Sequence, residues 1–241
     1  MIALGGKVAV ITGASRGIGL AIADALEAED AYVVRLARSL DAEIPAPPAD
    51  GPDRRIDLRC DCTSEADLAR AAAVVLETVG PPDILVNNAG AFFLAPLAAT
   101  PLDAFRHQLE ANLVTAFLVA RTFLPPMAER GRGHLVTIGS IADHVALPGN
   151  TAYAAAKFGL RGLHDVLAAE FTPRGLRATL LSPGATDTTL WDPIGPDARP
   201  DLPNRASMLR PADVAAAVVF ALTRPDGVEV ESLTLGPARG R

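Results

Sequence analysis

The fold of this chain is decided by residues 7–19, which read KVAVITGASRGIG. The apolar run from Lys7 to Thr12 predicts a buried strand, and the apolar side chains of residues 17–29 recur with a helical period. Glycines between a strand and a helix permit a tight turn, a close approach of the backbone to a pyrophosphate and close helix packing. The helix N-terminus then offers free N–H groups and a positive dipole to phosphates. The stretch therefore predicts a strand–loop–helix unit that binds a dinucleotide, and it lacks the lysine of a P-loop.

The rest of the chain continues the same alternation of short apolar runs and longer alanine-rich runs. Strands that are apolar on both faces and separated by helices indicate one parallel sheet of about seven strands, covered on both sides. Pro125 and Pro126 are expected to mark a kink or break in the longest helix. The further strands are expected at 32–37, 56–60, 83–87, 133–138, 176–181 and 232–235, and the further helices at 64–79, 101–129, 151–171 and from Pro211.

Size and charge narrow the classes of function. The chain has 241 residues, a net charge of −6 and no stripe of Lys or Arg, so nucleic acid is not an expected partner. The N-terminus does not have the pattern of a signal peptide, and no uninterrupted apolar stretch approaches the length of a membrane span. We therefore expect a cytoplasmic protein with no membrane partner. No linker divides the chain, so we expect one domain over residues 1–241.

The sequence predicts no metal site. Cys60 and Cys62 form a C-x-C pair, which lacks the further ligands of a structural zinc site. Two small, part-buried thiols in a reducing compartment are the simpler interpretation. The four histidines, at 107, 134, 144 and 164, do not have the spacing of a metal-binding motif.

Two side chains of the predicted helix 151–171 carry the chemistry that we expect. Tyr153 and Lys157 are four residues apart, so they are neighbours on one face of that helix. An ammonium beside a phenol stabilises the phenolate and lowers the phenol pKa, which is about 10 in water. Such a tyrosine can exchange a proton with a substrate oxygen near neutral pH.

The end of the second predicted strand indicates which dinucleotide is bound. An acidic residue there would accept a hydrogen bond from the adenosine ribose 2′-OH. This chain has Arg38 instead, with no carboxylate before Asp41. Arg38 and Arg16 can pair with a 2′-phosphate through charge-assisted hydrogen bonds, and the alternative is that both are ordinary surface arginines. We expect NADP(H) to be favoured, with NAD(H) as the alternative cofactor.

With these residues the chain resembles a short-chain dehydrogenase/reductase of the single-domain type, from about Lys7 to Leu235. The resemblance implies a Rossmann-type α/β fold, a three-layer sandwich with helices on both faces of the sheet. One departure is the proline-rich stretch 44–53, which stands where many members of the family have a helix. The motifs that carry the resemblance are the glycine loop at 12–19, Asn87-Asn88-Ala89-Gly90, Asn112, Ser140, Tyr153, Lys157 and Pro183-Gly184.

The resemblance implies a cofactor site made by the glycine loop and by residues that follow the strands. Asp61 would bind the adenine amine, with Cys62 contributing backbone. Thr188 would contact the nicotinamide amide, Thr186 would approach it through backbone, and Lys157 would hold the nicotinamide ribose. The cofactor-binding residues implied in this way are Gly13, Ser15, Arg16, Gly17, Ile18, Gly19, Arg38, Asp61, Cys62, Asn88, Ala89, Gly90, Tyr153, Lys157, Pro183, Gly184, Thr186 and Thr188.

The resemblance also implies a reaction, hydride transfer between the nicotinamide and a carbonyl or alcohol substrate of ketone or 3-oxoacyl type. Tyr153 would be the general acid or base, and Ser140 would orient the substrate oxygen. Lys157 would tune the phenol, and Asn112 would order a water beside Lys157. A non-catalytic NADP-binding sensor or regulator on the same fold is the main alternative. A dehydratase or epimerase is disfavoured, because such relatives usually have a larger C-terminal region.

The long segment 186–210 is expected to be a mobile loop that closes over the substrate. Trp191 could line the pocket or anchor this loop to the body of the protein. The residues after Ser140 that are expected at the pocket border are His144, Val145 and Leu147. The resemblance further implies a homotetramer or homodimer, formed through the helices 101–129 and 151–171.

Overall fold

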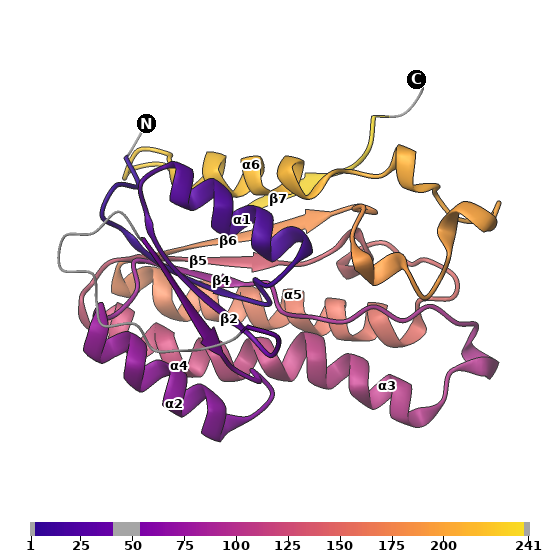
Figure 1. The fold of residues 1–241 in the computed structure, drawn as a ribbon, viewed down its shortest axis with the longest axis horizontal. Helices are drawn as coiled ribbons and strands as arrows, with labels where there is room; N and C mark the ends of the chain where they lie inside the picture. The colour runs from indigo at the N-terminus through magenta and orange to yellow at the C-terminus, as the bar shows by residue number, and fades with distance from the viewer. Residues whose placement is uncertain (1–2, 41–53, 239–241) are drawn as a thin grey trace.

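Seven parallel strands form one sheet in the order β3-β2-β1-β4-β5-β6-β7 (Figure 1). The computed structural model describes residues 3–40 and 54–238, so the predicted proline-rich stretch 44–53 lies outside the described residues. The parallel sheet predicted from the sequence is confirmed. The strands are β1 (Val8–Thr12), β2 (Tyr32–Ala37), β3 (Arg55–Arg59), β4 (Ile84–Asn87), β5 (Gly133–Ile138), β6 (Leu176–Pro183) and β7 (Ser232–Leu235).

Helices cover both faces of the sheet, which makes the predicted three-layer α/β sandwich. One layer contains α1 (Gly17–Ala28) and α6 (Pro211–Leu222) (Figure 1). The other layer contains α2 (Glu65–Thr78), α4 (Thr115–Glu129) and α5 (Thr151–Phe171). The remaining helical segments are α3 (Leu102–Leu109), the π-helical turn η2 (Glu110–Val114) and the short turns η1 (Leu97–Ala99), η3 (Ile141–Asp143), η4 (Thr172–Arg174), η5 (Thr189–Trp191), η6 (Pro196–Ala198) and η7 (Arg205–Ser207).

Successive side chains of each central strand enter different cores. Ala9 and Ile11 of β1 pack in the core that α1 and α6 cover, whereas Val10 between them packs in the core that α2, α4 and α5 cover. All three side chains are fully buried. A strand that is buried on both faces is apolar throughout, which is why a continuous apolar run predicted it.

The long helical run differs from its prediction at the two prolines. Of the kink or break expected at Pro125 and Pro126, the break is wrong, because α4 continues through both to Glu129. Leu124 and Met127, beside the prolines, are 1% and 0% exposed, so their packing outweighs the hydrogen bonds that proline removes. The backbone departs from α-helical geometry at η2 instead, between α3 and α4. Such π-helical turns are frequent at functional sites, and this one carries Asn112.

The same run, Leu102–Glu129, is long and apolar enough to span a membrane by length and composition alone. In the structure 56% of its most apolar 18-residue stretch is buried inside the protein. Phe123 and Leu124 belong to the core that α4 shares with the sheet. Packing in the core therefore accounts for the apolar character of this helix.

The strand order creates a crevice at one end of the sheet. β1 pairs with β2 on one side and with β4 on the other. The chain therefore runs from β1 through β2 to β3 on one side, and then crosses to β4 on the other side of β1. Ligands of open α/β sheets bind at such a switch point, outside the carboxyl ends of the strands. The glycine loop follows β1 at this point.

The segment between β6 and α6, the 186–210 loop, is tied together by its own contacts. Thr186 and Leu209 form a parallel bridge at its base. Arg205 forms ion pairs with Asp187 and Asp192, on the other side of the loop. The loop therefore has a closed base and three short helical turns, while its predicted mobility stays a prediction.

Candidate functional site

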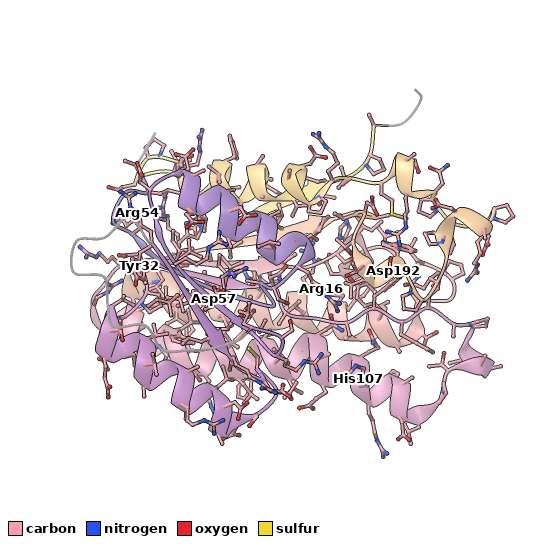
Figure 2. All side chains as sticks on the ribbon, viewed as in Figure 1. Arg16, Tyr32, Arg54, Asp57, His107 and Asp192 are labelled. Atoms are coloured by element: carbon pink, nitrogen blue, oxygen red, sulfur yellow. The ribbon has the colours of Figure 1, made fainter. Side chains whose placement is uncertain are left out.

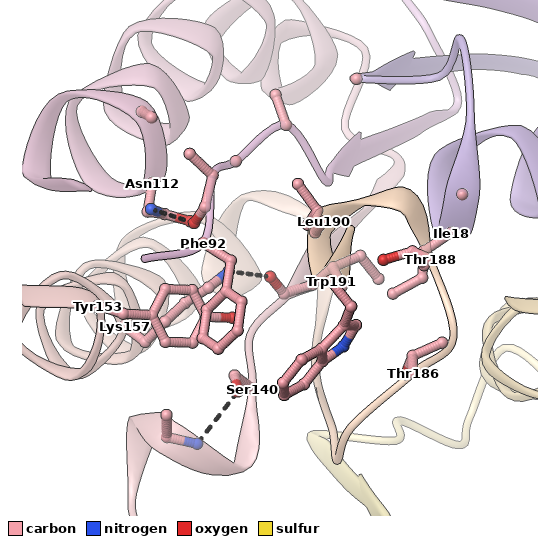
Figure 3. Close-up of a pocket in the computed structure, with 18 of the residues that line it drawn as sticks. Ile18, Phe92, Asn112, Ser140, Tyr153, Lys157, Thr186, Thr188, Leu190 and Trp191 are labelled. Carbon is pink, nitrogen blue, oxygen red and sulfur yellow. Dashed lines mark hydrogen bonds between the residues drawn. The ribbon is translucent and has the colours of Figure 1, made fainter. Parts of the chain in front are cut away.

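One cavity of about 980 Å³ lies at the carboxyl ends of the strands (Figure 3). Every residue that the sequence predicted for catalysis or cofactor binding lines this cavity. They include Arg16 after β1, and His107 of α3, which was not predicted, also lines the cavity (both are labelled in Figure 2). The predicted residues come from the segment after β1 (Gly13, Ser15, Arg16, Gly17, Ile18, Gly19), after β2 (Arg38), after β3 (Asp61, Cys62), after β4 (Asn88, Ala89, Gly90), from η2 (Asn112), after β5 (Ser140), from α5 (Tyr153, Lys157) and from the end of β6 and beyond (Pro183, Gly184, Thr186, Thr188).

The glycine loop is shaped by contacts that leave no room for side chains. Gly13 and Gly17 have φ angles of +65° and +58°, in the left-handed region that favours glycine. A Cβ on Gly19 would lie 2.5 Å from the carbonyl oxygen of Gly13. Asn88, which follows β4, donates through Nδ2 to the carbonyl oxygen of Thr12 at 2.8 Å. The loop is thus held close to the neighbouring strand.

Thr12 completes the connection between β1 and β4. Its Oγ1 accepts hydrogen bonds from the backbone amides of Asn88 and Ala89, both at 3.0 Å. The same hydroxyl donates to the carbonyl oxygen of Val86 at 3.2 Å. These bonds fix the floor of the cavity where the glycine loop meets the segment after β4.

This end of the cavity fits a dinucleotide. In the described structure no side chain caps the N-terminus of α1, so the first N–H groups of that helix are available to a ligand. Gly13, Gly17 and Ser15 line the cavity beside that helix end. A diphosphate requires backbone N–H donors, a positive helix end and room to approach them, and this end of the cavity offers all three.

Two arginines line the cavity where the sequence predicts the adenosine of a dinucleotide. Arg16 and Arg38 are both exposed and line it. Asp61, which follows the adjacent strand β3, accepts hydrogen bonds through Oδ1 from the amide and hydroxyl of Thr63, at 3.0 and 2.7 Å. These bonds orient the carboxylate for which the resemblance implies a contact with adenine.

The two cysteines flank Asp61 and are buried free thiols, as the sequence predicts for the pair. Their Sγ atoms lie 4.0 Å apart. The contact with Cys60, together with burial, raises the pKa of the Cys62 thiol. Within residues 3–40 and 54–238, no group of three His, Cys, Asp or Glu side chains could hold a metal ion.

Tyr153 and Lys157 lie on one face of α5, as their spacing predicts, and both side chains reach the cavity (Figure 3). Lys157 is 5% exposed, and its Nζ donates to the carbonyl oxygen of Ile138 at 3.0 Å. The same Nζ lies 5.7 Å from the centroid of the Tyr153 ring. Burial lowers the pKa of Lys157 to about 8, with the charge of Asp143 acting in the opposite direction.

The predicted lowering of the phenol pKa is wrong for the protein alone. Burial raises the pKa of Tyr153 to about 12, although the Ser140 hydroxyl acts in the opposite direction. The phenolate loses its hydration in this position, and an ammonium that faces the ring does not compensate for that loss. The Tyr153 phenol is therefore uncharged at neutral pH.

Ser140 follows β5 and caps the short turn η3. Its Oγ accepts a hydrogen bond from the amide of Ala142 at 3.1 Å (Figure 3). Its own amide donates to Oδ2 of Asp143, also at 3.1 Å. Because Oγ acts as an acceptor within the turn, its proton can be donated to a ligand oxygen in the cavity.

Asn112 is 2% exposed and lies in the π-helical turn η2. Its Nδ2 donates to the carbonyl oxygens of Ala91 and Gln108, both at 3.0 Å. A Cβ on Gly90 would lie 2.6 Å from the Asn112 Oδ1 atom, so this glycine is required by close approach. Asn112 thus holds the segment after β4, and the water predicted beside Lys157 stays a prediction.

Phe92 is a site residue that the sequence analysis did not identify. Its ring centroid lies 4.9 Å from that of Tyr153, edge-on at 78°, and 4.9 Å from that of Trp191 at 59° (Figure 3). All three rings line the cavity. Trp191 therefore has both of the roles considered from the sequence. It lines the pocket, and its contact with Phe92 connects the 186–210 loop to the body of the protein. An aromatic residue soon after Asn87-Asn88-Ala89-Gly90 was the only signal in the sequence.

Of the three residues expected at the pocket border, Leu147 lines the cavity and the other two do not. The ring of His144 is turned to Asp143, with its Nδ1 2.5 Å from Oδ1. Val145 is 41% exposed. Neither side chain therefore borders the cavity, which a position count along the sequence could not anticipate.

Comparisons with known proteins identify the family that the chain resembles. Residues 7–199 match the model of a family described as short chain dehydrogenase. A glycine betaine reductase, ATRR, of Emericella nidulans is 34% identical over 240 residues, and the match covers 97% of this chain but only 19% of that relative's length. An uncharacterized oxidoreductase of Staphylococcus aureus is 31% identical over 237 residues, 98% of this chain and 100% of the relative.

Solved structures of dehydrogenases have a similar fold. An alcohol dehydrogenase of Thermococcus sibiricus, complexed with 5-hydroxy-NADP, is 29% identical with a TM-score of 0.82, and the match covers 98% of each chain. A short-chain dehydrogenase of Streptomyces avermitilis is 30% identical with a TM-score of 0.81, over 98% of this chain and 89% of the other.

Proposed function

The chain belongs to the short-chain dehydrogenase/reductase family, and from this premise we propose that it is an NADP(H)-dependent oxidoreductase that interconverts a carbonyl and an alcohol. The observation that carries the proposal is that Ser140, Tyr153 and Lys157 line the same cavity as the glycine loop. A proton donor and a cradle for a dinucleotide in one cavity are what hydride transfer to a carbonyl requires.

The cofactor supplies or accepts the hydride when it is bound, and the side chains handle the proton. Ser140 donates its hydroxyl proton in a hydrogen bond to the substrate oxygen and so holds that oxygen in place. Tyr153, whose pKa of about 12 keeps it neutral, gives its Oη proton to the same oxygen during reduction. In oxidation the proton returns to Tyr153. Lys157 stabilises the phenolate that the transfer leaves, and Asn112 orders a water that resupplies the proton.

The residues at the adenosine end support a preference for NADP(H). Arg16 and Arg38 bring two guanidinium groups to this end of the cavity, where a 2′-phosphate would carry negative charge. The Thermococcus sibiricus relative, which was solved with an NADP derivative, supports the same choice. We assign Asp61 and the Cys62 backbone to adenine. At the other end, we assign Pro183, Gly184, Thr186 and Thr188 to the nicotinamide.

We further propose that residues 1–241 act as one domain and that the 186–210 loop moves to admit substrate. Copies of the chain would associate through α4 and α5. Exposed aromatic side chains support this, because Phe117 of α4 and Phe158 of α5 are 44% and 47% exposed. The apolar lining that Phe92, Leu147 and Trp191 provide favours a substrate that is partly apolar.

Replacing the proposed proton donor tests the function. Tyr153→Phe is expected to lower kcat by about a hundredfold or more, because general acid catalysis is removed, with little change in NADPH affinity. Tyr32→Phe is the matched control, since Tyr32 lies on β2 and does not line the cavity. The assay follows nicotinamide absorbance with a panel of carbonyls and alcohols. A fully active Tyr153→Phe variant, or tight NADPH binding with no turnover of any substrate, contradicts the proposal, and the second result favours a sensor.

A further inference from the structure

Asp143 is a fully buried carboxylate behind the proposed site, with an exposure of 0%. It closes the turn η3 that begins after Ser140. The proposed mechanism gives it no role. A charge in the interior is costly unless it is paired and hydrogen-bonded, so the partners of Asp143 indicate what it does.

The two oxygens of this carboxylate join three parts of the fold. Oδ2 accepts hydrogen bonds from the Ser182 hydroxyl of β6 at 2.6 Å and from the Ser140 amide at 3.1 Å. Oδ1 accepts from Nε of Arg161 on α5 at 3.3 Å, and it lies 2.5 Å from Nδ1 of His144. One side chain therefore ties the turn that carries Ser140 to the strand β6 and to the helix that carries the proposed proton donor.

The carboxylate is ionised in this setting. Burial alone would raise the pKa of Asp143, but the hydrogen bonds from Ser182, His144 and Ser140 outweigh burial and hold the pKa below its ordinary value. An ionised carboxylate is an acceptor only, so the Ser140 amide has a fixed partner at neutral pH. Gly139 fits the same arrangement, because a Cβ at that position would overlap Oδ2 of Asp143.

We propose that Asp143 is a positioning residue for the reaction, which fixes the Ser140 hydroxyl against the substrate oxygen by accepting a hydrogen bond from the Ser140 amide. Ser182 and Arg161 hold the carboxylate so that the turn cannot shift. The inference rests on the proposed function, since it requires Ser140 to bind the reacting oxygen. A displacement of about 1 Å in such a group can lower the rate by about a hundredfold.

A double-mutant cycle of Asp143→Asn and Ser140→Ala tests the proposal. Asparagine has nearly the same shape but turns an N–H₂ group toward two of the four donors. Asp143→Asn is expected to lower kcat by about tenfold or more, with the NADPH dissociation constant unchanged within about twofold. In the Ser140→Ala background the same change is expected to lower kcat by less than about twofold, because the hydroxyl it positions is gone. Asp103→Asn, whose side chain is 95% exposed, is the control.

The outcomes separate this inference from the proposed function. Equal losses with and without the Ser140 hydroxyl, or full activity of Asp143→Asn, overturn the positioning role and leave the function standing. A wild-type protein that turns over no carbonyl or alcohol overturns both. If Asp143→Asn does not fold, Ser182→Ala replaces it in the cycle, because it removes a donor that holds the carboxylate and is expected to show the same dependence on Ser140.

Discussion

The two ends of the cavity are built in different ways. The dinucleotide end consists of backbone, where Gly13, Gly17 and Gly19 bring the chain close to the segment after β4. The other end, where we propose that the substrate binds, consists of side chains, with Phe92 and Trp191 in contact beside Tyr153. Backbone geometry is dictated by neighbours in the sequence, whereas contacts between side chains depend on segments that meet only in the folded protein. The first end was therefore predictable from a short motif, whereas at the second end the sequence indicated Ser140, Tyr153 and Lys157 but not the contact of Phe92 with Trp191.

Disrupting the backbone-built end should have the largest effect. A Cβ on Gly19 would lie 2.5 Å from the Gly13 carbonyl oxygen, so Gly19→Ala must displace the loop. Overpacking of this kind costs about 1–3 kcal/mol, and we expect NADPH affinity to fall by up to about a hundredfold. Fluorescence titration with NADPH measures it. Gly162→Ala in α5 is the control, because a Cβ there meets nothing within 4 Å. If Gly19→Ala and Gly162→Ala bind NADPH equally well, the backbone of the glycine loop does not determine cofactor binding.

Lys157 lies where the two ends meet, and its titration should appear in the stability of the protein. Its pKa falls from the ordinary 10.5 to about 8 on folding, so between these values the unfolded chain binds more protons than the folded one. The free energy of unfolding must then rise with pH over this window. Relative to Lys157→Met, the wild type is expected to gain about 3 kcal/mol between pH 7 and pH 10.5, measured by urea unfolding. If the difference in unfolding free energy between the two proteins stays constant with pH, folding does not lower the pKa of Lys157.

Arg38 tests whether a side chain can decide the choice of cofactor at an end that backbone builds. Hydrogen bonds to charged groups contribute about 1.5–3 kcal/mol, so Arg38→Ala is expected to weaken NADPH binding by about tenfold or more. NADH lacks the 2′-phosphate and serves as the internal control, with its affinity unchanged. Equal weakening of both cofactors in calorimetric titrations would assign Arg38 a structural role instead.

The smallest expected effect belongs to the side-chain-built end. Trp191→Ala removes an aromatic contact worth about 0.5–1.5 kcal/mol, which corresponds to an increase of about two- to tenfold in the KM of a carbonyl substrate. NADPH affinity should not change. Phe220→Ala on α6 is the control, since Phe220 is 46% exposed and lies outside the cavity. A loss of NADPH affinity in Trp191→Ala, measured by the same titration, would show that the two ends are not independent.

The regular elements were predicted well because each is specified by local pattern. The strands 32–37, 133–138 and 232–235 and the helix 151–171 have the predicted bounds. The helix does not break at Pro125 and Pro126, because burial of the neighbouring side chains overrides a local preference, and a kink there stays a prediction. The pKa of Tyr153 was misjudged for a related reason. Helical spacing reveals that Lys157 is near, but it does not reveal how deeply the phenol is buried.

The sequence by itself determined the alternating α/β order, the glycine loop and the pairing of Tyr153 with Lys157, because each depends on residues within a few turns of one another. Only the tertiary structure decided that Phe92 meets Trp191 and that the Asp143 carboxylate accepts hydrogen bonds from both Ser140 and Ser182. These contacts join residues from different elements, and their burial depends on the packing of the whole molecule. Burial and contacts distant in sequence are properties of the complete fold, so no local pattern contains them.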